Sequence, residues 1–184
     1  MDRLYFATGN KDKVAEATAI LDFPIEIFPV ELDEVQDLNL ENIARKKVKA
    51  AYALVKSPVF VDDVSMEIDI WKNFPGPFIK YLREAGGNDL LLYMLRNEEN
   101  RKAKVIATIA YHDGVDVNCF TAVETGIITL QPRGENSWGF DPIFQPDGSD
   151  LTFAEMTTGE KNSRSHRRHA LDQFKEFLNS QTTG

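Results

Sequence analysis

The sequence predicts an α/β fold with a mixed, twisted central sheet and flanking helices, arranged as two lobes around a cleft within one domain of 184 residues. In the first third of the chain, short apolar runs typical of buried strands are interleaved with amphipathic helical segments. Further on, two alternating segments flank an Asp-Gly turn, which indicates a β-hairpin. Interleaved helices favour parallel strand pairing and a hairpin adds antiparallel pairing, so we expect a mixed sheet.

In the first half of the chain, apolar residues recur at helical spacing twice, from Val14 to Leu21 and from Leu40 to Val55. Pro24 lies just beyond the first of these helices and ends it. Short buried strands are expected at residues 4–8, 25–29 and 59–61, and a half-exposed strand at 66–70, where apolar and acidic residues alternate.

In the second half, two short helices are expected, the first ending at Gly86-Gly87 and the second near residues 89–96. Strands at 105–111 and 115–124 flank the turn, and another strand is expected at 126–130. Residues 131–150 are rich in Gly and Pro, which predicts loops. A C-terminal helix carries apolar residues on one face and leads into a loose tail from about residue 180.

Composition narrows the class of protein and its location. The formal net charge of −8 argues against broad binding to a nucleic-acid backbone. No apolar run approaches the roughly 20 residues of a membrane span. The N-terminal segment from Met1 to Phe6 is too short and too polar to be read as a signal peptide. The single cysteine, Cys119, excludes an internal disulfide and is typical of a reducing compartment. We therefore expect a cytoplasmic protein without nucleic-acid or membrane partners.

The segment from Thr8 to Lys13 joins a predicted strand to a predicted helix. A helix start offers unpaired N–H groups and a favourable dipole for an anion, and Gly9 lets the backbone approach a ligand closely. Thr8 and Asn10 add side-chain donors, and Lys13 adds a positive charge. The alternative is an ordinary turn with an Asn cap, because one glycine does not make a phosphate loop.

Carboxylates form the second candidate site. Asp62 and Asp63 directly follow an apolar strand, and a strand end can bend both toward one cleft. Two adjacent carboxylates suit Mg²⁺, which binds one or two of them together with substrate phosphates. Glu34, in an acidic stretch before the second helix, could complete such a site. The alternative for each is a solvated acidic turn or loop.

Two segments in the last third could bind a nucleotide. Trp138-Gly-Phe-Asp-Pro142 places aromatic rings that can stack on a base beside a hydrogen-bond acceptor, or these rings simply pack on the core. The segment from Gly159 to His169 contains several basic side chains in an otherwise acidic protein, which makes it a candidate anion-binding site. A solvated helix face is the alternative.

These segments, taken in order, resemble the inosine triphosphate pyrophosphatase family, also called the Ham1-like or non-canonical purine NTP pyrophosphatases. The resemblance covers nearly the whole chain. Its motifs are Thr8-Gly-Asn-x-x-Lys13, Phe60-Val-Asp-Asp63, Phe74-Pro-Gly-Pro77 with Ile79-Lys80, Trp138-Gly-Phe-Asp-Pro142, Thr152-Phe-Ala-Glu-Met156, and Glu160-Lys-Asn162 through Ser165-His-Arg167 with Ala170-Leu171.

The resemblance implies a homodimer that hydrolyses non-canonical purine nucleoside triphosphates (ITP, dITP and XTP) with Mg²⁺, giving the monophosphate and pyrophosphate and cleansing the nucleotide pool. It implies that Asp63 is the catalytic base and that Glu34, Asp63 and Asp62 serve the metal. It also implies that Lys46, whose neighbour is Lys47, contacts substrate. The remaining substrate-binding residues would be Thr8, Gly9, Asn10, Lys13, Trp138, Phe140, Asp141, Lys161, His166 and Arg167.

The chain departs from the family pattern at the acidic strand. The family reads Glu-Asp-Ser/Thr-Gly there, whereas this chain reads Asp62-Asp63-Val64-Ser65. Asp62 is one methylene shorter than Glu, Val64 lacks a hydroxyl, and Ser65 constrains the backbone more than Gly does. Two other functions stay open: a Maf-like pyrophosphatase acting on other nucleotides, and a nucleotide-binding protein without catalysis.

Overall fold

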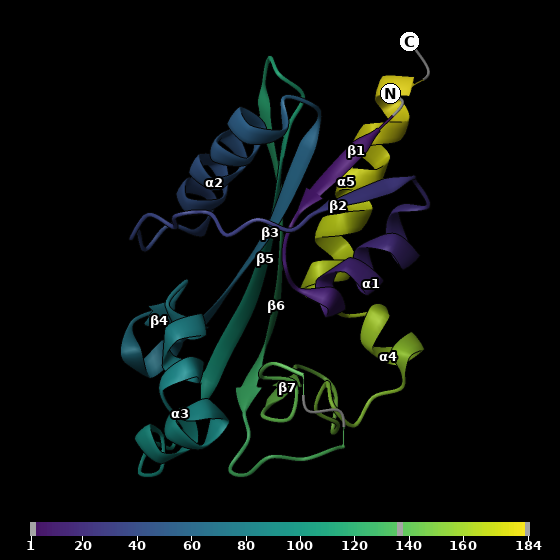
Figure 1. Ribbon diagram of the computed structural model, residues 1–184. Coiled ribbons are helices and arrows are strands. Elements are labelled where there is room, and N and C mark those ends of the chain that lie inside the picture. The colour runs from purple at the N-terminus through teal and green to yellow at the C-terminus, as the bar shows by residue number, and fades with distance from the viewer. Residues whose placement is uncertain (1–2, 136–137, 183–184) are drawn as a thin grey trace. The chain divides into compact units, whose positions relative to one another are not determined.

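The computed structural model describes residues 3–135 and 138–182 (Figure 1). Its strands lie in the order β2 (Ile25–Phe28), β1 (Leu4–Ala7), β3 (Val59–Ile68), β5 (Lys102–His112), β6 (Val117–Ile128) and β7 (Phe144–Pro146), and β4 (Pro75–Gly76) pairs with β3. β1 is parallel to both β2 and β3, whereas β3 with β4 and β6 with β7 are antiparallel. The sheet is thus mixed and carries helices, which confirms the predicted fold class. The expected cleft and the single-domain organisation stay predictions.

The chain forms two compact units, and three long strands run from one into the other: β3 (Val59–Ile68), β5 (Lys102–His112) and β6 (Val117–Ile128). The first unit comprises residues up to Val64, Ala107–Ala122 and residues from Arg167 onward. Besides its share of the long strands, it contains β1 (Leu4–Ala7), α1 (Lys11–Leu21), β2 (Ile25–Phe28), α2 (Leu40–Val55) and α5 (His166–Thr182).

The second unit comprises Ser65–Ile106 and Val123–His166. It contains a 3₁₀ turn, η1 (Asp69–Trp71), and β4 (Pro75–Gly76), α3 (Ile79–Met94), β7 (Phe144–Pro146) and α4 (Thr158–Asn162). Its buried apolar side chains include Leu91 from α3, Phe144 from β7 and Phe153 from the loop that follows. The rings of Phe144 and Phe153 lie 5.2 Å apart.

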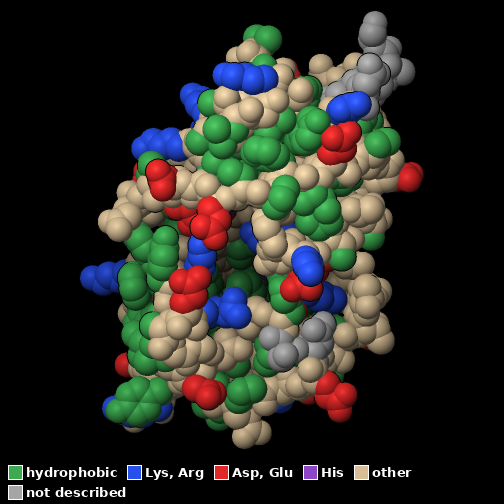
Figure 2. Space-filling view, viewed as in Figure 1, with side chains coloured by type: hydrophobic (Ala, Val, Ile, Leu, Met, Phe, Trp, Pro, Cys, Tyr) green, Lys and Arg blue, Asp and Glu red, His purple; other side chains and the backbone are tan. Residues whose placement is uncertain are grey.

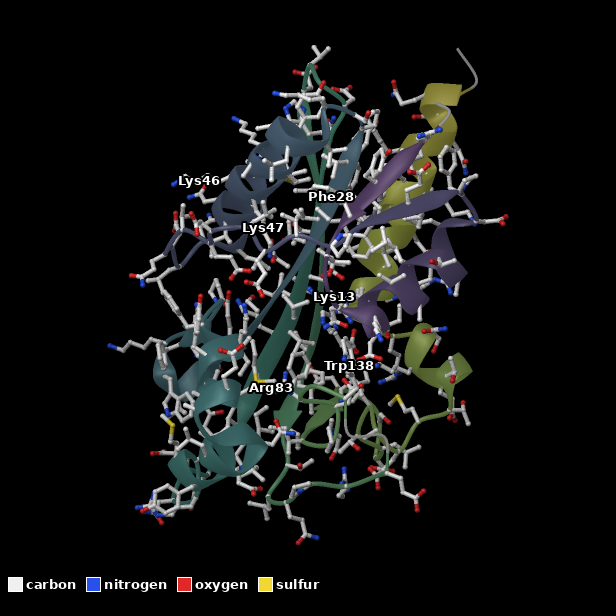
Figure 3. All side chains as sticks on the ribbon, viewed as in Figure 1. Lys13, Phe28, Lys46, Lys47, Arg83 and Trp138 are labelled. Atoms are coloured by element: carbon white, nitrogen blue, oxygen red, sulfur yellow. The ribbon has the colours of Figure 1, made fainter. Side chains whose placement is uncertain are left out.

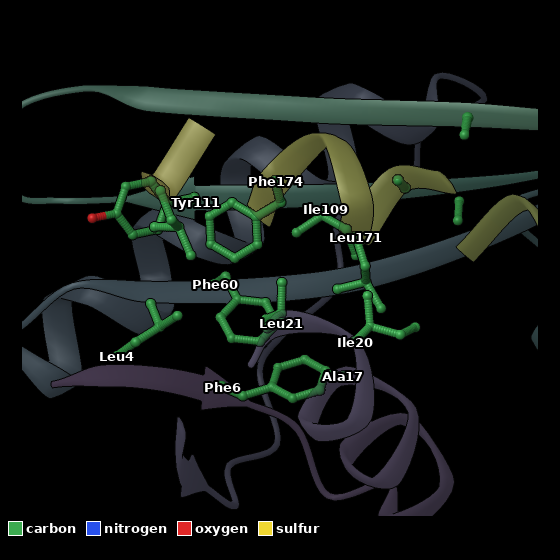
Figure 4. Packing of buried hydrophobic residues seen from close by; sticks show 14 residues of the cluster. Leu4, Phe6, Ala17, Ile20, Leu21, Phe60, Ile109, Tyr111, Leu171 and Phe174 are labelled. Carbon is green, nitrogen blue, oxygen red and sulfur yellow. The ribbon is translucent and has the colours of Figure 1, made fainter. Parts of the chain in front are cut away.

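The sheet of the first unit is buried on both faces, because side chains alternate along each strand. On one face, Leu4 and Phe6 of β1 join α1 and α5 in a cluster where the rings of Phe6 and Phe60 stack at 4.2 Å (Figure 4). On the other face, Ala7 packs with Ala44, Val48 and other residues of α2. This core holds β1, the first residues of β3 and α1 in fixed positions.

Three element boundaries differ from the prediction. β3 is one ten-residue strand and not two, since no Gly or Pro interrupts residues 59–68. β6 likewise continues through Gly126, where a Cβ atom would come within 2.2 Å of the Gln145 carbonyl oxygen. α5 extends to Thr182, beyond the expected start of the tail, and residues 183–184 lie outside the described part.

The predicted pair of short helices is present as α3, which is kinked where it was expected to break. Gly86 and Gly87 have non-helical backbone angles, and Gly87 has φ of 65°. The turn of the β5–β6 hairpin is also confirmed, with Gly114 at φ of 108° and the Asp113 carboxylate accepting from the N–H groups of Val115 and Asp116. Across the described ranges, no helix has the length and apolar character needed to cross a bilayer.

Candidate active site

The turn between β1 and α1 is held by its own polar side chains. Asn10 caps α1, and its Oδ1 accepts from the N–H groups of Asp12 at 2.9 Å and Lys13 at 3.2 Å. The Thr8 hydroxyl oxygen accepts from the N–H of Asn10 at 3.1 Å. The Asn-cap alternative is thus correct for the local structure. It leaves phosphate binding at this turn a prediction.

Gly9 is not required by the packing of the turn. A Cβ atom at Gly9 would meet no atom within 4 Å, and its backbone does not have positive φ. Backbone strain and crowding therefore do not explain this glycine. The open space beside it is what a ligand approaching the backbone at the start of α1 would need.

Asp62 lies in the middle of β3, where it pairs with two cations of the first unit. Its Oδ2 accepts from Nε of Arg167 at 2.6 Å, and its backbone oxygen accepts from Nζ of Lys13 at 2.5 Å. A second carboxylate, that of Glu16 on α1, accepts from Arg167 at 2.8 Å. Asp62 and Arg167 are both almost completely buried, so this is an internal ion-pair network.

Burial and charge oppose each other in this network. Burial alone would raise the pKa of Asp62, but the positive charges of Arg167 and Lys13 outweigh it and lower that pKa. Burial lowers the pKa of Lys13, and the nearby Arg167 lowers it further, against the attraction of Asp62. Asp62 is therefore an ionised carboxylate whose negative charge is balanced by Arg167 and Lys13.

Asp63 belongs to a second cluster, together with Glu34 and Lys47. Nζ of Lys47 donates to Oδ1 of Asp63 at 2.5 Å and to Oε1 of Glu34 at 2.8 Å. Burial alone would lower the pKa of Lys47, but the two carboxylates outweigh it and raise the pKa. Asp62 and Asp63 do not stand at the end of a strand as expected, because both lie within the continuous strand β3, and they pair with different cations. Their role at a metal site stays a prediction.

Lys47, and not Lys46, is the lysine of α2 that contacts the predicted acidic residues. Lys46 is exposed, and Figure 3 shows its side chain on the outer side of α2 while Lys47 lies nearer the sheet. Helical spacing explains the difference: Lys47 is four residues after the buried Ile43 and three after the buried Ala44. That spacing was readable in the sequence and identifies Lys47 without the structure.

The carboxylates of this cluster fit a hard cation. Oδ2 of Asp63 is buried and has no hydrogen-bond partner in the described part of the chain. A buried acceptor without a donor is costly, and a cation would satisfy it. Among the described residues there is no group of three or more His, Cys, Asp or Glu side chains arranged around one metal position. A cation here would therefore rely on few protein ligands, as is usual for Mg²⁺ bound with phosphates.

The second unit brings three of the predicted base-binding residues together. Nζ of Lys161 donates to Oδ2 of the buried Asp141 at 2.6 Å and lies 4.9 Å from the centre of the Trp138 ring. The adjacent Phe140 is buried, and its ring lies 6.0 Å from that of His166. Phe140 and His166 thus support this group from the core of the second unit.

Comparisons with known proteins show the family of this chain. The model of the Ham1 family matches residues 4–177. The chain is 40% identical to the dITP/XTP pyrophosphatase of Thermococcus kodakarensis over 96% of its length and 97% of that protein, and 36% identical to the inosine triphosphate pyrophosphatase of Scheffersomyces stipitis over 98% and 100%. A HAM1 protein from Coxiella burnetii has a similar structure, with a TM-score of 0.85, 29% identity, and coverage of 98% of this chain and all of that one. The chain belongs to the Ham1 family.

Proposed function

We propose that the protein hydrolyses non-canonical purine nucleoside triphosphates (ITP, dITP and XTP) to the monophosphate and pyrophosphate, and so cleanses the nucleotide pool. The observation that carries this proposal is the buried carboxylate of Asp63, which shares Lys47 with Glu34 and has one oxygen that no described residue donates to. The names of the relatives, dITP/XTP and inosine triphosphate pyrophosphatase, support the reaction and the substrate class.

Glu34 and Asp63 would hold the Mg²⁺ ion. When bound, Mg²⁺ polarises phosphoryl oxygens and makes a coordinated water more acidic. Asp62 is left out of the proposed ligand set, because Arg167 and Lys13 already engage its carboxylate. The free oxygen of Asp63 is the reason that we assign this residue both the metal and the base role.

The triphosphate is proposed to bind at the start of α1 and beside the two lysines of the first unit. The backbone at Gly9, Thr8 and Asn10 faces the phosphates, and Lys13 and Lys47 supply positive charge. A water oxygen attacks the α-phosphorus, its proton passes to Asp63, and the bond to the β-phosphate oxygen breaks to release pyrophosphate. The lysines stabilise the negative charge that develops on the leaving group.

The base is proposed to bind to the group of the second unit. Trp138 offers a ring for stacking, and the Asp141–Lys161 pair offers a fixed acceptor and a donor. Phe140 and His166 hold that loop from behind. Hypoxanthine and xanthine carry an oxygen at C6 where adenine carries an amino group, so a donor placed at this atom favours ITP and XTP over ATP.

Replacing Lys47 by Met should lower kcat/KM for ITP by roughly 10- to 100-fold, the loss expected for a charged hydrogen bond. Lys46→Met is the matched control, since it removes the same charge from the exposed side of the same helix and should leave kcat/KM nearly unchanged. Steady-state kinetics on both variants measures the difference. Equal effects from the two substitutions would remove Lys47 from the proposed site.

The products of ITP hydrolysis separate this proposal from its alternatives. Phosphorus NMR of a reaction with Mg²⁺ should show IMP and pyrophosphate, with no orthophosphate released first. IDP with orthophosphate would contradict cleavage at the α-phosphorus. Binding of ITP without any product would favour the nucleotide-binding alternative, and faster turnover of a pyrimidine triphosphate would favour a Maf-like activity.

We further propose that the protein acts in the cytoplasm as a homodimer, which its resemblance to the family implies. A reducing compartment agrees with its single cysteine, Cys119, whose pKa burial raises to about 11, so the thiol stays protonated and unreactive. On the face shown in Figure 2, Lys and Arg side chains are interspersed with Asp and Glu. Such a surface agrees with the expectation that nucleic acid is not a partner.

A further inference from the structure

Arg83, on α3 of the second unit, carries a positive charge that no described carboxylate pairs with. Its guanidinium group has no ion pair and no hydrogen bond to any residue that the structure describes, although its Nε is buried. A buried donor without an acceptor is costly, and natural proteins keep few of them. A donor that the described residues leave open is available to an acceptor from outside the chain.

The position of Arg83 connects it to the predicted base-binding loop. One of its terminal nitrogens lies 3.9 Å from the point that a Cβ atom would occupy on Gly139, between Trp138 and Phe140. Figure 3 labels Arg83 and Trp138, and both side chains lie in the same part of the second unit. A side chain on Gly139 would enter this space, so the glycine keeps Arg83 beside an open part of the loop.

The kink in α3 allows two of its residues, Arg83 and Asn88, to face this loop. Nδ2 of Asn88 donates to the carbonyl oxygen of Gly139 at 3.1 Å, so Arg83 and Asn88 face the same residue. Positions five apart in a regular helix differ by about 140° around its axis. The non-helical angles of Gly86 and Gly87 make their common direction possible. The same Asn88 leaves its buried Oδ1 without a partner in the described residues.

We propose that Arg83 determines purine specificity by donating to the O6 and N7 atoms of a 6-oxopurine base. This inference rests on the proposed function. A planar guanidinium group matches two neighbouring acceptors, and O6 with N7 is the pair that arginine most often binds in nucleic-acid recognition. Adenine replaces O6 by an amino donor, which arginine cannot bind. Lys161, the cation that lies against the Trp138 ring, already pairs with Asp141.

The proposal predicts a specific pattern of selectivity. Guanine shares O6 and N7 with hypoxanthine, so Arg83 should not distinguish GTP from ITP. Arg83→Gln should lower kcat/KM for ITP, XTP and GTP by roughly 10- to 100-fold. It should leave the slower reaction with ATP nearly unchanged. Arg83→Lys keeps the charge without the planar fork and should fall between the wild type and Arg83→Gln.

Arg96→Gln is the matched control in the same unit. Arg96 is exposed, lies 4.0 Å from the Tyr93 ring and donates to its carbonyl oxygen, away from the loop at Gly139. Kinetics with ITP and ATP should be combined with calorimetric titration of IMP and AMP, which needs no turnover. We expect Arg83→Gln to weaken IMP binding by roughly the same factor as kcat/KM, and to leave AMP binding unchanged.

Equal losses for inosine and adenine nucleotides in Arg83→Gln, or no loss for either, would overturn the inference. So would an identical loss in Arg96→Gln. A wild-type enzyme that releases no pyrophosphate from ITP would overturn the proposed function instead. In that case the IMP and AMP titrations still decide whether Arg83 reads the base.

Discussion

Asp63→Asn should reduce kcat for ITP by roughly 10²- to 10⁴-fold, the contribution typical of a general base, and should keep the protein folded. The substitution preserves the shape of the side chain and one oxygen, but it removes the negative charge that pairs with Lys47. The amide can neither take a proton from water nor bind a cation as a carboxylate does. Kinetics at saturating Mg²⁺, together with circular dichroism of the variant, measures both parts of this result.

Asp69→Asn is the control for this experiment. Asp69 lies on the exposed 3₁₀ turn η1, where its backbone oxygen accepts from the N–H of Lys72, so its carboxylate should be dispensable. We expect turnover within about twofold of the wild type. Near-normal turnover in Asp63→Asn itself would remove Asp63 from the mechanism.

Arg167→Met should lower the free energy of unfolding by about 3–5 kcal/mol, which is the loss typical when one partner of a buried ion pair is removed. The change leaves Asp62 buried in the first unit with Lys13 alone, and it also takes from Glu16 its bond to Arg167. Urea denaturation monitored by circular dichroism gives this difference directly. The expected loss is large because both Arg167 and Asp62 are almost fully buried.

The neighbouring arginine offers a matched control. Arg168 pairs with Asp172 on the surface of α5 at 2.8 Å, in a helical i,i+4 pair. Surface pairs of this kind contribute only about 0.3–0.5 kcal/mol, so Arg168→Met should be nearly neutral. If the two variants lose the same stability, the buried network is not what stabilises the first unit.

The effect of Arg167→Met should also depend on pH. In the wild type, the lowered pKa of Asp62 stabilises the folded state above the ordinary aspartate pKa, near 4, and this contribution is lost as the pH falls through the lowered value. Without Arg167, burial favours the protonated form, so acid no longer weakens this site. The stability difference between the two proteins should therefore shrink below about pH 4.

The sequence predicted the fold class and most elements because its apolar residues recur with clear periods. Leu4 and Phe6 alternate with Tyr5 as in a strand, and Gly86-Gly87 broke the helical pattern where α3 is kinked. The length of β3 was not predicted, since two acidic residues in its middle resemble a turn. Only the tertiary contacts with Arg167 and Lys47 make a buried strand of that composition possible.

Some contacts of the candidate site were predicted from the sequence, and others were not. Trp138, Asp141 and Lys161 meet in the second unit as expected. The pairing of Asp62 with Arg167 was not predicted, because ion pairs between residues 105 positions apart cannot be read from local sequence. The metal and substrate roles expected of these two residues stay predictions. Lys47 could have been found from its helical spacing. Arg83 could not, because what distinguishes it from a surface arginine is a buried Nε to which no described residue offers an acceptor.

The most direct test of the proposed function is a pyrophosphate-release assay with ITP, XTP, GTP, ATP and UTP, each with Mg²⁺ and with EDTA. ITP and XTP should be hydrolysed far faster than the other three, and only in the presence of Mg²⁺. Comparable rates with ATP or UTP, or unchanged rates in EDTA, would contradict a metal-dependent enzyme that selects non-canonical purines.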